Sequence, residues 1–165
     1  MAPKQCTALL VIDMQEMDYP LEERASMVDF IPRLNELIDY FHNKGLPIYH
    51  SMMKEYPCVE DWDKIMPEVH RYDSDVIVSK PQNDAFENPD LTKLLRDRNV
   101  CHVVVAGVVL SSCVALTAIG AVKNKFQATI ASEAVSEGQG EPKNLEYSLE
   151  IGVSLKTNRE ILSVV

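Results

Sequence analysis

The chain has 165 residues, the length of one ordinary domain, and its 46% hydrophobic and 25% charged residues are typical of a globular protein. The net charge of −9 argues against a nucleic-acid partner, because phosphate binding needs a concentrated basic face. The longest apolar run, residues 103–110, is too short to span a bilayer, and the first residues lack the apolar core of a signal peptide. We therefore expect a single cytoplasmic domain, residues 1–165, with no nucleic-acid and no membrane partner.

The strands and helices predicted from apolar patterning alternate along the chain. Short apolar runs predict strands at residues 7–14, 47–53, 75–78, 100–109, 128–131 and 152–156. Helical spacing predicts helices at about residues 32–45, 91–98, 112–125 and 143–150. Residues 54–72 interrupt this order and are expected to form a loop or lid with a short helical piece. Because alternating strands and helices form right-handed βαβ units, we expect a three-layer α/β/α sandwich with a six-stranded, mainly parallel sheet.

In such a fold the active site lies beyond the carboxyl ends of the strands, near the switch point in strand order. Three chemically complementary residues occupy such positions. Asp13 ends the first predicted strand, Lys80 follows the third, and Cys113 follows the fourth, near the start of the next helix. We therefore expect these three side chains to meet, although each alone is more often structural.

The three side chains suit hydrolysis through a covalent thioester. Cys113 would be the nucleophile, with its thiolate stabilised by the helix N-terminus and the Lys80 ammonium. Asp13 would take the thiol proton and later donate it to a leaving amine. Backbone N–H groups of the loop before Cys113 would bind the oxyanion, and the site would need no cofactor.

The four cysteines, Cys6, Cys58, Cys101 and Cys113, form no CxxC pair and no metal-ligand pattern. In an intracellular chain this favours free thiols over a disulfide framework. Their number does not identify the nucleophile.

Several segments resemble the isochorismatase-like cysteine hydrolases, which include nicotinamidases, N-carbamoylsarcosine amidases, ureidoacrylate amidohydrolases and isochorismatases. They are TALLVIDMQ at residues 7–15, SK with DAF at residues 79–86, and AGVVLSSCVALTAIGAV at residues 106–122. The resemblance spans nearly the whole chain, and the segment from Gly107 to Ala118 is its most specific part.

The resemblance implies the catalytic triad of Asp13, Lys80 and Cys113, and a cis peptide bond between residues 108 and 109. It also implies that the N–H groups of Val109 and Cys113 form the oxyanion hole. Three further residues match positions that line the family's pocket; they are Gln15, Tyr19 and Phe86.

Two departures from the family pattern bear on substrate and metal. Nicotinamidases carry an Asp-x-His metal pair after the second strand, but the matching positions here are Met52 and Lys54. Neither is a suitable ligand for a hard or borderline divalent metal, and His50 and His70 are isolated, so no metal site is expected. In addition, Leu-Ser-Ser at residues 110–112 replaces the common Thr-Asp-x.

The leading hypothesis is therefore a metal-independent amidohydrolase that cleaves a C–N bond of a small amide or carbamoyl compound. One alternative is an isochorismatase-type vinyl-ether hydrolase, for which the thiol is not strictly required. The other is a non-catalytic binding protein with the same fold. The expected partner is a small-molecule substrate, and family relatives imply a homo-oligomer.

Overall fold

The computed structural model describes residues 6–16, 27, 29–54, 61–138 and 140–165. Six parallel strands form one sheet in the order β3-β2-β1-β4-β5-β6. The strands are β1 (Thr7–Ile12), β2 (Ile48–Met53), β3 (Val76–Lys80), β4 (His102–Val108), β5 (Gln127–Ser136) and β6 (Ser154–Lys156). The predicted six-stranded α/β sandwich is thus confirmed, with a sheet that is entirely parallel.

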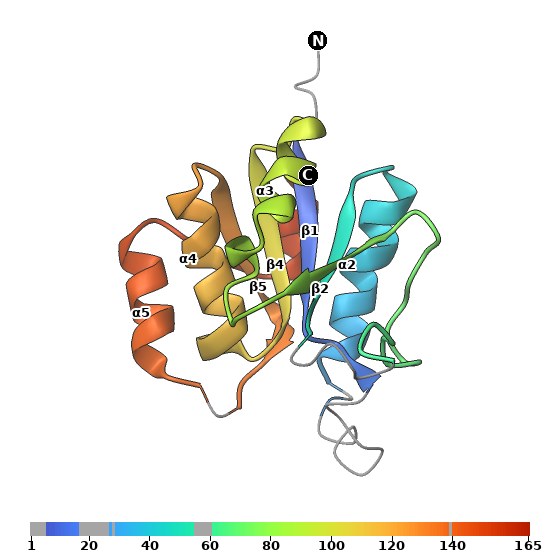
Figure 1. Ribbon diagram of the computed structural model, residues 1–165, viewed down its shortest axis with the longest axis horizontal. Coiled ribbons are helices and arrows are strands. Elements are labelled where there is room, and N and C mark those ends of the chain that lie inside the picture. The colour runs from blue at the N-terminus through green and yellow to red at the C-terminus, as the bar shows by residue number, and fades with distance from the viewer. Residues whose placement is uncertain (1–5, 17–26, 28, 55–60, 139) are drawn as a thin grey trace.

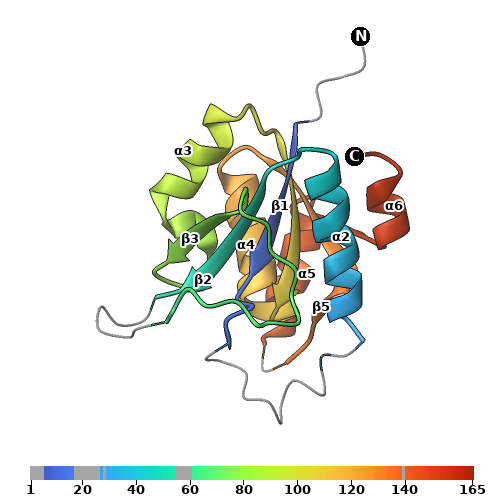
Figure 2. The same cartoon turned by 90° about the vertical axis from the view of Figure 1, so that its right-hand side faces the viewer.

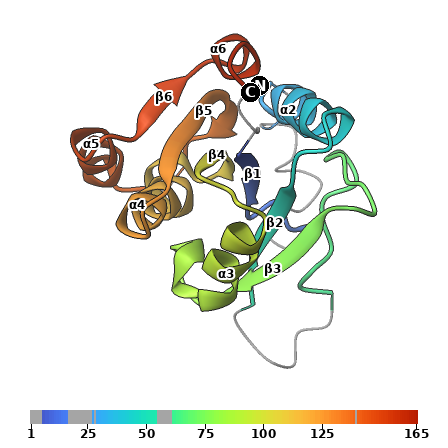
Figure 3. The same cartoon turned by 90° about the horizontal axis from the view of Figure 1, so that it is seen from above.

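Helices cover both faces of this sheet. The α-helices are α2 (Ile31–Asn43), α3 (Pro89–Asp97), α4 (Ala115–Lys123), α5 (Pro142–Glu150) and α6 (Asn158–Leu162), with short turns η3 (Ala85–Glu87) and η4 (Leu110–Val114). Figure 3 shows α2 and α6 on one side of the sheet and α3 and α4 on the other. Figure 2 shows α2 running alongside the central strands.

Two hydrophobic cores follow from the alternation of side chains along the strands. In β1, Leu9 and Val11 face the core beneath α2, whereas Leu10 and Ile12 face the core beneath α3 and α4. All six residues of β1 are buried, because helices cover both faces of a parallel sheet. The sheet therefore holds the strand ends in fixed positions, and the loops that follow them lie together at the lower end in Figure 1.

The structure differs from the predicted elements in places where tertiary contacts decide the backbone. Strand β5 continues to Ser136, beyond the predicted residue 131, with an irregular pairing to β4 after Val105. Helix α4 begins at Ala115 instead of residue 112, because Ser112 has non-helical φ and ψ angles. In the described residues 61–72 no helix forms. Helix α6 was not predicted, although its capping box of Thr157 and Glu160 is readable in the sequence.

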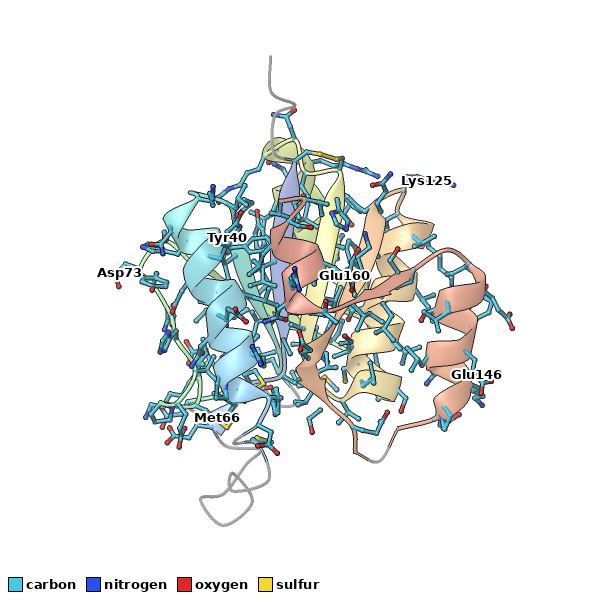
Figure 4. All side chains as sticks on the ribbon, turned by 180° about the vertical axis from the view of Figure 1, so that it is seen from behind. Tyr40, Met66, Asp73, Lys125, Glu146 and Glu160 are labelled. Atoms are coloured by element: carbon cyan, nitrogen blue, oxygen red, sulfur yellow. A yellow bond between two sulfur atoms is a disulfide. The ribbon has the colours of Figure 1, made fainter. Side chains whose placement is uncertain are left out.

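The expectation of free thiols is wrong for two cysteines. Cys6 and Cys101 form a disulfide, with their Cα atoms 5.3 Å apart (Figure 4). They precede β1 and β4, which are neighbouring strands paired from Thr7 opposite His102, so residues 95 positions apart in sequence become adjacent. Cys113 is free, and Cys58 lies outside the described residues.

A search of the described part of the chain finds no helix of the length and hydrophobicity needed to cross a membrane.

Gly107 allows β4 to approach β1 just before the loop that leads to Cys113. Its φ is +110°, and a Cβ built on it would lie 2.2 Å from the carbonyl oxygen of Ile12. We expect Gly107→Ala to lower the free energy of unfolding by about 2–4 kcal/mol, because it combines a disfavoured φ with a backbone clash. Urea denaturation measures this loss.

Gly152→Ala is the matched control. Gly152 also has a positive φ, +103°, but a Cβ there would meet nothing within 4 Å. We expect this control to lose only about 1 kcal/mol. Equal losses in the two variants would contradict the role assigned to close strand packing.

Candidate active site

The strand order brings the three predicted catalytic residues to one edge of the sheet. Asp13 directly follows β1, Lys80 is the last residue of β3, and Cys113 lies in η4, after β4. The strands β1 and β4 are neighbours at the point where the strand order changes direction. Ligands of open α/β sheets bind outside the carboxyl ends of the strands at such a switch point.

Lys80 lies between the other two side chains. Its Nζ is 2.9 Å from Asp13 Oδ2 and 3.4 Å from Cys113 Sγ. The lysine side chain is fully buried, and Asp13 is 8% exposed. Asp13 has φ +52°, a left-handed conformation that aspartate tolerates better than most residues. A buried ammonium is therefore paired with a carboxylate and lies in contact with a thiol.

Two residues that the sequence did not single out complete the polar contacts of this centre. The carbonyl oxygen of Gln82 accepts a hydrogen bond from Lys80 Nζ at 3.2 Å. Asn83 Oδ1 accepts from Cys113 Sγ at 3.6 Å. Both residues come soon after Lys80 in the sequence, which could have suggested that they lie near the lysine. Nothing in the sequence indicated that Asn83 contacts Cys113.

The surroundings of Cys113 disfavour ionisation of its thiol. Burial raises its pKa above the usual value, and the negative charge of Asp13 raises it further. Lys80 acts in the opposite direction but does not outweigh these two effects. In the free protein the sulfur therefore holds its proton at neutral pH, and Asp13 is placed to remove it.

The raised thiol pKa predicts a distinct pH profile for alkylation. Because only the thiolate reacts, the rate of labelling of Cys113 by iodoacetamide should rise with pH, with a midpoint above the ordinary value of about 8.5. Asp13→Asn should lower this midpoint, because it removes a negative charge that disfavours the thiolate. Mass spectrometry of labelled Cys113 measures both. A wild-type midpoint below pH 7 would contradict the assignment.

The loop between β4 and Cys113 has an unusual backbone. The Val108–Val109 peptide bond is cis. Farther along, the N–H groups of Ser112 and Val114 both donate to the carbonyl oxygen of Val109, at 3.1 and 3.2 Å. The amide of Cys113 lies between these two donors in the sequence. The N–H groups predicted to form the oxyanion hole are therefore at the two ends of one short, folded loop.

The three residues expected to line the pocket have different surroundings. Gln15 is 1% exposed, and its Nε2 donates to the carbonyls of Met53 and Trp62 while its Oε1 accepts from the Met53 amide. Through these contacts Gln15 links the residues that follow β1 to the end of β2 and to Trp62. Phe86 packs against Phe126, which precedes β5, so its ring is part of the hydrophobic core on that face of the sheet. Tyr19 lies outside the described residues.

The residues considered for a metal site lie apart. Met52 is buried in the interior, and Lys54 Nζ lies over the ring of Trp62. His50 Nε2 is 3.0 Å from Asp75, and His70 pairs separately with Asp39. Across the described ranges, no three His, Cys, Asp and Glu side chains are grouped as metal ligands.

The strand ends thus bring an acid, a lysine and a cysteine together, and comparison with known proteins gives the family of the chain. A family model described as Isochorismatase domain matches residues 7–149, so the chain belongs to the isochorismatase family and is a hydrolase. It is 28% identical over 153 residues to the uncharacterized isochorismatase family protein YwoC of Bacillus subtilis, covering 80% of this chain and 78% of that protein.

Solved structures of the family share the fold over nearly the whole chain. N-carbamoylsarcosine amidase from Thermoplasma acidophilum has a TM-score of 0.80 at 21% identity, with 92% of this chain and 96% of that chain covered. Pyrazinamidase of Pyrococcus horikoshii, solved in complex with zinc, has a TM-score of 0.75 at 25% identity, with 92% and 99% covered.

Proposed function

We propose that this hydrolase is a metal-independent amidohydrolase that cleaves a C–N bond of a small amide or carbamoyl compound through a thioester on Cys113. The observation that carries the proposal is the position of Lys80 Nζ, 2.9 Å from Asp13 and 3.4 Å from the sulfur. This arrangement joins a nucleophile, a base and a fixed positive charge. Two proteins that share the fold are amidases by name, and amide hydrolysis is the reaction class proposed here.

Acylation would begin when Asp13 removes the proton from Cys113 Sγ as the sulfur attacks the substrate carbonyl carbon. A C–S bond forms, and the carbonyl electron pair moves to oxygen. The resulting oxyanion would accept hydrogen bonds from the N–H groups of Val109 and Cys113. Collapse of this intermediate breaks the C–N bond, and protonated Asp13 donates its proton to the leaving amine.

Deacylation would use the same groups with water as the nucleophile. Asp13 takes a proton from water, and the hydroxyl attacks the thioester carbon. The C–S bond then breaks, and protonated Asp13 returns its proton to the leaving sulfur to restore the thiol. Lys80 keeps its charge throughout. It would stabilise the carboxylate of Asp13 and the thiolate that forms transiently at Cys113, which explains why a fully buried lysine stands between them.

The residue types present support metal independence. The positions where nicotinamidases carry an Asp-x-His pair hold Met52 and Lys54, a soft thioether and a cation. Lys54 contacts the Trp62 ring and Met52 packs in the interior, so neither presents an oxygen or imidazole ligand. Dialysis against a chelator is therefore expected to leave the activity unchanged, and a large loss would contradict this part of the proposal.

The experiment that tests the proposal is ammonia release from a panel of small carboxamides, carbamoyl compounds and ureas. Release that exceeds the background and depends on Cys113 would support an amidohydrolase. Pyruvate release from isochorismate that survives Cys113→Ala would instead identify a vinyl-ether hydrolase. If neither product forms, a non-catalytic binding protein is the better description.

A further inference from the structure

The hydroxyl, the N–H and the carbonyl of Ser111 are all hydrogen-bonded by residues that follow β5. Its Oγ donates to Glu137 Oε1 at 2.6 Å, and the Glu137 carboxylate also accepts the backbone N–H of Ser111. Its carbonyl oxygen accepts from the Glu141 amide and from Asn144 Nδ2, both at 3.1 Å. Ser111 is only 2% exposed, two residues before Cys113. The loop that bears the nucleophile is thus held by side chains from another part of the fold.

The glutamate is itself fixed in place. Burial acts to raise the pKa of Glu137, but hydrogen bonds from Ser111 and from the Gly138 amide hold it below its usual value. The side chain is therefore ionised at neutral pH and is a strong acceptor. Close packing accompanies these contacts, because a Cβ at Gly140 would lie 2.2 Å from Ser111 Oγ.

The loop needs such support because its own backbone does not follow a helix. Ser111 has φ −88° and ψ 19°, and Ser112 has φ −129° and ψ −108°. A regular helix would fix the direction of each amide through its own hydrogen bonds. In this loop the hydrogen bonds of Ser111 fix the direction of the backbone instead. Ser111 lies midway in the sequence between Val109 and Cys113, whose amides are the predicted oxyanion donors.

We propose that Glu137 is a positioning residue which, through Ser111, aims the backbone N–H groups that bind the oxyanion during acylation of Cys113. This inference rests on the proposed function, since it concerns the same site. Glu137 would not touch the substrate. Its role is to keep the two amides converging on one point, and small displacements of such donors are costly in rate.

Two reagents that attack the same sulfur differently test this role. p-Nitrophenyl acetate transfers its acetyl group to Sγ through a tetrahedral oxyanion and releases p-nitrophenolate. Iodoacetamide alkylates Sγ by direct displacement of iodide, with no oxyanion. The ratio of the two rate constants at Cys113 therefore reports on the oxyanion hole and is insensitive to the state of the thiol. Stopped-flow absorbance measures the first rate, and mass spectrometry measures the second and confirms the modified residue.

We expect Glu137→Gln and Ser111→Ala each to lower this ratio about 10- to 100-fold, with alkylation nearly unchanged. The double variant should be little worse than either single variant, because both break the same contact. Glu146→Gln is the matched control, since this exposed glutamate on α5 carries the same substitution away from the loop (Figure 4). Its ratio should equal that of the wild type.

A ratio within twofold of the wild type in both single variants, or a rise in either, would overturn the inference. If the wild type is alkylated but never acylated, the loop forms no oxyanion site and the inference also fails. If the wild type is acylated and the variants behave as expected, but no amide is hydrolysed, the amidohydrolase proposal fails while the role of Glu137 stands. Ser111→Ala keeps the test valid should Glu137→Gln not fold.

Discussion

Replacing Cys113 with alanine is expected to lower amide hydrolysis about 10⁴-fold or more while leaving the fold intact. The sulfur is the atom that would form the covalent bond, and loss of the nucleophile removes that route completely, leaving only catalysis by binding and the oxyanion hole. The cost in stability should stay small, because Cys113 is only half-buried and alanine differs from it only by loss of the sulfur. Steady-state ammonia release and thermal unfolding measure the two effects.

The matched control removes cysteines at the opposite end of the sheet. Cys6 and Cys101 precede β1 and β4, whereas the triad follows the carboxyl ends of the strands. Alanine at both positions should therefore retain kcat for the amide, although it removes the disulfide. Retention of the full activity in Cys113→Ala would refute the thioester mechanism, and equal losses in the two variants would show that the effect is not specific to the nucleophile.

The second large effect concerns the buried ion pair. Lys80→Met keeps the apolar stem of the side chain but leaves Asp13, which is only 8% exposed, without its charged partner. Removing one member of a buried pair typically costs about 3–5 kcal/mol, because the remaining charge is uncompensated. We expect a loss of this size in chemical denaturation, together with loss of amide hydrolysis.

Two further variants separate charge from packing. Lys93→Met breaks an exposed pair with Asp97 on α3 and should cost far less stability, because solvent screens that pair. Asp13→Asn combined with Lys80→Met removes both charges, so it should recover part of the stability of Lys80→Met but none of its activity. If Lys80→Met and Lys93→Met were equally stable, Lys80 would not carry a buried charge in the folded protein.

The correspondence between sequence and structure is closest where one local pattern decides the outcome. The run TALLVI at residues 7–12 is mostly apolar and contains β-branched residues, which predicts a strand covered on both faces, and it forms β1. Leu34, Leu37, Ile38 and Phe41 recur at helical spacing and are all buried in α2. Polar residues in the second half of β5 concealed its length, because only pairing with β4 extends it to Ser136.

For the candidate site, the sequence by itself indicated which three polar residues would lie together. An acid, a lysine and a cysteine each lie at or just beyond the carboxyl end of a predicted strand. A parallel sheet has one edge at which these ends lie, so the three were expected together. Their close contact in the structure agrees with this rule. The rule depends only on the order of elements along the chain, which hydrophobic patterning can supply.

Only the tertiary structure decided the environment of these residues. Burial and the nearby Asp13 charge, which no spacing reveals, raise the pKa of Cys113. The Cys6–Cys101 disulfide depends on which strands are neighbours. Likewise, Glu137 reaches Ser111 because β5 lies beside β4, so residues 26 positions apart share a hydrogen bond. Local sequence patterns specify the strands and helices, and they show which side chains lie at the carboxyl ends of the strands. Desolvation and long-range contacts arise only once the sheet has assembled.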